Sequence, residues 1–136
     1  MLEIDILLPN KEIKKAPFSL MNIDEIYDYM YIEGHLNIAL DKQVVFSEDI
    51  AVIEFYWYIV KWYRQNNLNQ NTPFVYSTVE YTEPILTFSI FDNEHWQIRS
   101  PWLEVAVPVI VSNYELETQI KKIMCLLTDN LEISSD

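Results

Sequence analysis

Two histidines and one cysteine are the side chains of this 136-residue chain that most often serve in catalysis or metal binding. A zinc site would require His35 and His95 to be joined by carboxylates, but neither stands in an HxxxH or HxE spacing. Both lie among the outward-facing positions of alternating strand patterns. We therefore expect two solvent-facing or locally hydrogen-bonded histidines and no metal site.

Nucleophilic catalysis has no support in the sequence either. Cys125 is the only cysteine, which excludes an intramolecular disulfide, and its place on an apolar helical stripe predicts a buried, inert thiol. Gly34 is the only glycine, so no serine stands in a glycine-flanked elbow and no GxGxxG or GxxxxGKS/T loop exists. These observations predict a non-enzymatic protein without a cofactor.

The charge balance is the strongest chemical feature of the chain. Nine basic and twenty-one acidic residues give a net charge of −12, which repels nucleic acid and anionic membranes and speeds encounter with a basic protein. If the downstream strands form one meander, several of their carboxylates share an edge or outer face and form an anionic recognition patch. The alternative is that they only keep a sheet edge in solution. The candidates are Glu80, Glu83, Asp92, Glu94 and Glu104.

The segment FYWYIVKWYRQ, residues 55–65, carries six aromatic side chains. Bases could stack on such rings, but base stacking needs a basic groove, and this molecule is acidic. At helical spacing the rings occupy two opposite faces, so core packing is expected, with the face around Trp57 able to pair two copies in a homodimer. Tyr56 and Tyr63 fall toward the flank and are predicted to be exposed, with Tyr56 a candidate for partner binding.

Alternating apolar residues predict the strands that must position these side chains. Asp41-Lys42 and Asp92-Asn93 read as turns between neighbouring strands. Helical spacing and capping residues predict helices over 48–66, beginning after Ser47, and over 112–130, where Ser112 and Glu115 form a capping box. For segment 10–30 the sequence fits either a short helix or a strand. We predict a single α+β domain over 1–136, with both helices packed on one face of a mainly antiparallel twisted sheet. Its predicted strands are Leu2 to Leu8, Leu36 to Leu40, Gln43 to Phe46, Phe74 to Tyr81, Leu86 to Ile90, Trp96 to Ile98 and Leu103 to Val111.

The order of elements resembles a known class of small proteins. A hairpin (GHLNIALDKQVVF), a hydrophobic helix (IAVIEFYWYIVKWY), strands (LTFSIFDNEHWQIRSPW) and an amphipathic C-terminal helix together look like the bacterial immunity proteins encoded beside polymorphic or contact-dependent toxins. The resemblance covers residues 30 to 130. It implies a protein that binds one cognate toxin domain, often a nuclease with a basic groove, and blocks it without catalysis.

Two further expectations concern ligands and location. The alternative function is a small-molecule-binding or enzymatic domain, whose pocket between sheet and helix would be lined by Tyr58, Trp62 and Trp96. The N-terminal MLEIDILLPNK is acidic where a signal peptide is basic, and no apolar run approaches the roughly 20 residues that span a bilayer. A cytoplasmic protein without membrane contact is therefore expected.

Overall fold

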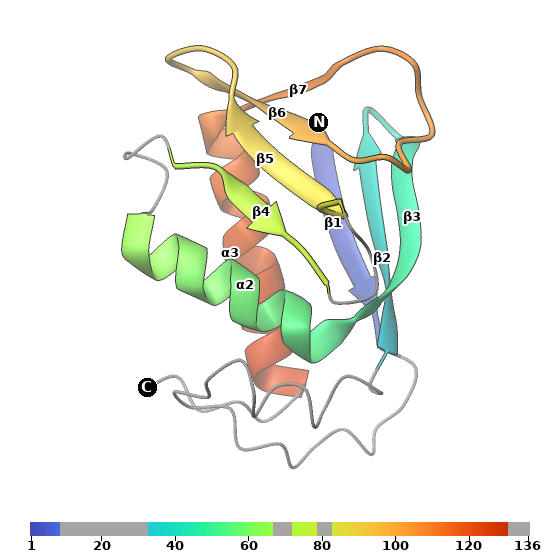
Figure 1. Cartoon of the computed structure of the whole chain (residues 1–136), viewed down its shortest axis with the longest axis vertical. Helices are drawn as coiled ribbons and strands as arrows, with labels where there is room; N and C mark the ends of the chain where they lie inside the picture. The colour runs from blue at the N-terminus through green and yellow to red at the C-terminus, as the bar shows by residue number, and fades with distance from the viewer. Residues whose placement is uncertain (9–32, 67–71, 79–82, 131–136) are drawn as a thin grey trace.

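The computed structural model describes residues 1–8, 33–66, 72–78 and 83–130, and these form two antiparallel sheets and two helices (Figure 1). The first sheet has the order β1-β2-β3: β1 Leu2–Leu7, β2 Glu33–Leu40 and β3 Gln43–Ala51. The second has the order β4-β5-β6-β7: β4 Phe74–Tyr76, β5 Leu86–Ile90, β6 His95–Arg99 and β7 Val109–Ser112. The helices are α2 Val52–Asn66 and α3 Asn113–Asn130. The α+β class is confirmed, whereas the single predicted sheet is in fact two. Segment 10–30 lies outside the described residues.

The β2–β3 hairpin follows from its local sequence. Asp41 and Lys42 have φ angles of 51° and 70°, the left-handed conformation that a two-residue hairpin turn requires. The predicted turn is confirmed. Past a register shift at Ile38/Ala39, β3 continues to Ala51, which pairs with Glu33.

The first predicted helix begins four residues too early. Ser47, Glu48 and Asp49 have the residue types of a helix N-terminus, but they belong to β3 and pair with β2. The cross-strand ladder of a whole hairpin outweighs the local capping preference, so α2 starts only at Val52.

The C-terminal helix matches its prediction. Ser112 Oγ accepts a hydrogen bond from the Glu115 amide at 3.1 Å, as expected of an N-cap.

The strand before α3 is shorter than predicted, because only Val109–Ser112 is strand. Residues 100–108 instead cross to the first sheet, where the Glu104 amide donates to the Val45 carbonyl at 2.8 Å. The strand predicted over Phe74 to Tyr81 likewise includes only Phe74–Tyr76 among the described residues.

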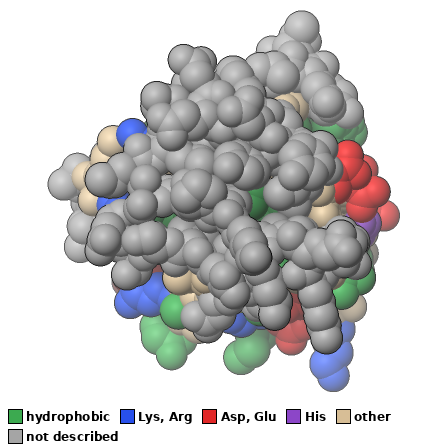
Figure 2. All heavy atoms as spheres, turned by 90° about the horizontal axis from the view of Figure 1, so that it is seen from below, with side chains coloured by type: hydrophobic (Ala, Val, Ile, Leu, Met, Phe, Trp, Pro, Cys, Tyr) green, Lys and Arg blue, Asp and Glu red, His purple; other side chains and the backbone are tan. Residues whose placement is uncertain are grey.

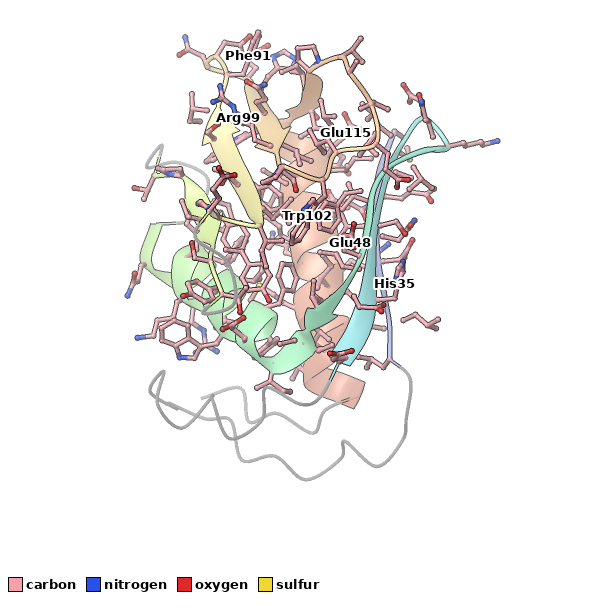
Figure 3. All side chains as sticks on the ribbon, turned by 45° about the vertical axis from the view of Figure 1, so that its right-hand side comes forward. His35, Glu48, Phe91, Arg99, Trp102 and Glu115 are labelled. Atoms are coloured by element: carbon pink, nitrogen blue, oxygen red, sulfur yellow. The ribbon has the colours of Figure 1, made fainter. Side chains whose placement is uncertain are left out.

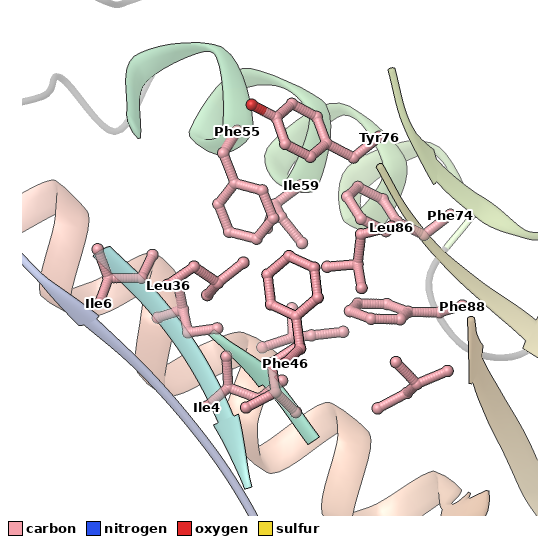
Figure 4. Packing of buried hydrophobic residues seen from close by; sticks show 14 of the residues in the cluster. Ile4, Ile6, Leu36, Phe46, Phe55, Ile59, Phe74, Tyr76, Leu86 and Phe88 are labelled. Carbon is pink, nitrogen blue, oxygen red and sulfur yellow. The ribbon is translucent and has the colours of Figure 1, made fainter. Parts of the chain in front are cut away.

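One hydrophobic cluster joins both sheets and both helices. Figure 4 shows Phe46 of the first sheet facing Phe88 of the second, with Phe55 of α2 beside them. Phe55 and Trp62 are only 1% and 6% exposed, so the aromatic helix is largely core, as predicted. Its rings meet β4 edge to face: Phe55 lies 6.2 Å from Phe74 at 89° between ring planes.

Candidate protein-binding site

The described carboxylates of the predicted acidic patch stand at different places along the second sheet. Asp92 and Glu94 lie in the turn between β5 and β6, whereas Glu83 precedes β5 and Glu104 follows β6. Because β5 spans about 14 Å, the described carboxylates are divided between the two ends of the second sheet. Asp92 and Glu94 therefore share one turn, whereas Glu83 and Glu104 lie away from it; Glu80 lies outside the described residues.

The turn that carries Asp92 and Glu94 is held by its own hydrogen bonds. Asp92 Oδ1 accepts from the Glu94 amide at 2.8 Å and lies 2.8 Å from His95 Nδ1. The Glu94 amide, and after it the His95 side chain, hold the pKa of Asp92 below its usual range. The Phe91 amide donates to the His95 carbonyl at 2.9 Å. The local hydrogen bond predicted for His95 is confirmed, and Asp92 shapes this turn.

The same turn is attached to the first turn of α3. The Asn113 amide donates to the Glu94 carbonyl at 2.9 Å, and Asn113 Nδ2 donates to the Asn93 carbonyl at 3.2 Å. Two contacts from a distant helix therefore fix the position of the turn. They also bring the residue that follows Asn113 into the neighbourhood of the β5–β6 turn.

Two exposed aromatic rings accompany the carboxylates. Phe91 is 57% exposed and Tyr114 is 79% exposed, the first in the turn and the second at the start of α3. Phe91 is labelled at the top of Figure 3, at the end of the second sheet. Phe91, Asp92, Glu94 and Tyr114 are called the acidic–aromatic surface below. Neither ring was among the predicted contact residues, although Phe91 is out of phase with Phe88 and Ile90, which marks it as outward-facing.

Tyr56 is not part of any exposed surface. It is only 7% exposed, and its hydroxyl lies 2.9 Å from Thr128 Oγ1 of α3. The prediction of an exposed contact residue is wrong because α3 covers this flank of α2. Tyr63 is half-buried and donates to Glu117 Oε1 at 3.1 Å, and its burial is the main cause that raises its pKa.

The Trp57 side of α2 is half-buried. Trp57 meets the ring of Tyr58 edge to face at 5.2 Å, and Lys61 Nζ lies 5.1 Å from the centroid of the Trp57 ring. A cation over an indole face is a favourable contact that covers part of the ring. Pairing of two copies through this side stays a prediction.

The three rings named for a ligand pocket pack against their neighbours. Trp62 and Trp96 are buried and lie 5.7 Å apart at 86°, and Tyr58 lies 5.6 Å from Tyr76. Trp62 Nε1 donates to the Thr72 carbonyl at 2.8 Å. These contacts fill the interval between helix and sheet with side chains and give the small-molecule alternative no support.

Among the described residues, no group of three or more His, Cys, Asp or Glu side chains could hold a metal ion. Neither α2 nor α3 is long and apolar enough to cross a membrane. Cys125 is exposed, so the prediction of a buried thiol is wrong; it stands beside the stripe of α3 that enters the core.

Comparison with known proteins places the chain in a family without assigning it an activity. Neither the curated proteins nor the solved structures include a match to this chain. A family described as a domain of unknown function, DUF7878, matches residues 11–133. This match covers most of the chain, including every described helix and all strands but the first. The chain therefore belongs to the DUF7878 family.

Proposed function

We propose that this chain is an immunity protein that binds a basic toxin domain through the acidic–aromatic surface. The observation that carries the proposal is the exposure of Phe91 and Tyr114 beside two carboxylates on a turn held by hydrogen bonds. Exposed rings that flank charge are typical of protein-binding surfaces, where aromatic side chains are enriched. The protein would act in the cytoplasm of a bacterium, where it meets the toxin.

The rigidity of the turn supports this use of the surface. Asp92 fixes the turn from within, and Asn113 fixes it from α3. A partner would therefore pay little conformational entropy to order the backbone that carries Phe91 and Glu94. The two rings would supply desolvated contacts near the centre of the interface, where most binding energy arises.

The net charge supports a basic protein as the partner. A molecule of charge −12 repels phosphate backbones, and its field attracts a cationic surface and raises the rate of encounter. A toxin that acts on nucleic acid needs a basic groove, and covering that groove would stop it. Inhibition of this kind needs no catalytic group on the immunity protein.

Two measurements test the proposal. The first is co-expression with the products of the genes that neighbour the gene for this chain, each tested as a toxin with cell survival as the readout. The second is binding kinetics of the purified pair across salt concentrations. Phe91→Ala with Tyr114→Ala should speed dissociation at least about tenfold, the effect of losing central contacts. Glu94→Lys should slow association and flatten its salt dependence.

Matched controls use the other end of the second sheet. Glu83→Lys makes the same charge change as Glu94→Lys on a residue outside the surface, so it should reduce the association rate less. Val75→Ala truncates an exposed apolar side chain of β4 and should leave dissociation unchanged. If the surface variants lost protection of the cell while their association and dissociation rate constants stayed unchanged, the proposed surface would be contradicted. A neighbouring toxin that this protein neither binds nor neutralises would contradict the immunity function.

A further inference from the structure

The outer face of the first sheet brings together a serine, a histidine and an aspartate. His35 Nδ1 lies 2.7 Å from Asp49 Oδ1, and His35 Nε2 lies 2.6 Å from Ser47 Oγ. His35 pairs directly with Asp49 across the β2–β3 ladder, and Ser47 pairs with the next outward residue of β2, Asn37. Side chains that alternate on one face of a hairpin meet at these distances. Figure 3 shows His35 on the side of the sheet away from the core.

The partners of the ring nitrogens decide the tautomer of His35. An ionised Asp49 can only accept, so the proton of the neutral ring lies on Nδ1. Nε2 then carries a lone pair, and the hydroxyl of Ser47 must be the donor. This order, carboxylate to Nδ1–H and Nε2 to hydroxyl, is the arrangement in which an imidazole can take the proton of a serine nucleophile.

We propose that Ser47 is a nucleophile that accepts an acyl group from activated carboxylic esters, with His35 as its general base. Ser47 Oγ would form a bond to the ester carbonyl carbon while its proton moves to His35 Nε2. The bond to the leaving oxygen then breaks, and His35 returns the proton to the leaving group. Water would cleave the acyl-serine in the same way, so that ester and water give acid and alcohol. Asp49 is a positioning residue, because it touches only His35.

Exposure limits the substrates to reactive ones. The side chains of His35 and Asp49 are 40% and 71% exposed, so water weakens the electrostatic gain that a buried triad has. Figure 2 shows acidic side chains gathered at the right-hand margin of the molecule seen from below. We therefore infer acyl transfer from esters with good leaving groups, not from amides. General-base assistance contributes about 100-fold to 10,000-fold in enclosed sites, and the lower end applies here.

No glycine-flanked elbow marks Ser47 in the sequence. An elbow exposes a serine at a sharp turn, whereas here the pleat of β3 presents Ser47. The three residues lie up to fourteen positions apart, and only the register of β2 against β3 joins them.

The test uses p-nitrophenyl acetate and peptide mapping by mass spectrometry. Cys125 is exposed and would itself react, so every variant carries Cys125→Ala. We expect acetylation at Ser47, its loss in Ser47→Ala, and labelling at least about tenfold slower in His35→Gln. Ser89→Ala, which removes a half-buried serine of β5, should label normally. Circular dichroism of each variant shows that it is folded.

The role of Asp49 has its own readout. In Asp49→Ala, the ring nitrogen NMR shifts of His35 should move away from the pure Nδ1–H tautomer, and Ser47 labelling should slow with them. A carboxylate that only holds β2 against β3 would change the ring shifts without slowing the labelling of Ser47. Asp49→Glu should restore part of both signals.

Two results would overturn the inference. One is the absence of acetyl-Ser47 in the folded protein under conditions that acetylate its lysines. The other is labelling of Ser47 in the His35→Gln variant at the same rate as in the protein that keeps His35. That result would mean that the three side chains only hold β2 against β3. Toxin binding is measured at the far sheet with other variants, so the failure of either proposal leaves the other standing.

Discussion

The Leu2 amide donates a hydrogen bond to Glu115 Oε2 at 2.7 Å, which ties the first strand to the last helix. The Ile4 amide donates in the same way to Gln119 Oε1 at 2.9 Å. Two residues of a strand advance about 6.7 Å and four residues of a helix about 6 Å, so these donors and acceptors match along the two elements. Side chains of α3 thus satisfy the amides of β1 that face away from β2, as a neighbouring strand would.

Replacing Glu115, which is half-buried, should therefore destabilise the fold. Glu115→Ala leaves the part-buried Leu2 amide without its acceptor and removes the partner of the Ser112 hydroxyl. We expect a loss of about 1–3 kcal/mol, measured by urea unfolding. Glu115→Gln keeps an acceptor oxygen and should lose less. Thr118→Ala, on an exposed position of the same helix, is the control; an equal loss there would contradict this role of Glu115.

Gly34 should tolerate no side chain. A Cβ at this position would clash with Val52 Cγ2 and lie 3.1 Å from the Leu7 carbonyl oxygen. Because one of these neighbours is backbone, Gly34→Ala should cost about 1–3 kcal/mol of unfolding free energy. Asn37→Ala, in the same strand, should change stability by less than about 0.5 kcal/mol. Equal thermal midpoints for the two variants would show that the backbone adjusts freely.

The Tyr56 hydroxyl should contribute to stability through Thr128. Tyr56→Phe removes the hydrogen bond between α2 and α3 while it keeps the ring, so we expect a loss of about 0.5–1.5 kcal/mol. Thr128→Val removes the other partner, and the double variant should lose less than the sum of the two single losses. Tyr114→Phe should leave the unfolding midpoint unchanged, since Tyr114 is 79% exposed. Additive losses in the double variant would argue against a direct bond.

The β5–β6 turn should weaken in acid because of Asp92. Hydrogen bonds from the Glu94 amide and from His95 lower the pKa of Asp92 from its ordinary value of 3.8. A lowered folded-state pKa means that the carboxylate stabilises the protein above its unfolded-state pKa and loses this effect as pH falls through the folded-state value. The stability difference between wild type and Asp92→Asn should therefore be largest near neutral pH and shrink below about 3.8. Urea unfolding across this range measures it, and a pH-independent difference would contradict the assignment.

The elements that depend on local patterns were predictable from the sequence alone. Alternation of Leu2, Ile4 and Ile6 marked β1, and all three are buried. Asp41 and Lys42 form the two-residue turn of the β2–β3 hairpin, which requires a positive φ angle at both positions. In both cases a few neighbouring residues determine the local backbone conformation, and the tertiary structure keeps that conformation.

Contacts between distant segments decided the features that the local patterns did not predict. Ser47 and Asp49 have residue types that favour a helix start, but pairing with β2 made them strand and placed them beside His35. Tyr56 lies on a helix flank whose exposure depends on where α3 crosses, and α3 buries it. The separation of Asp92 from Glu104 depends on the direction of β5 and β6. Sequence periodicity reports which face of an element a residue occupies, but only the packing of elements determines what covers that face.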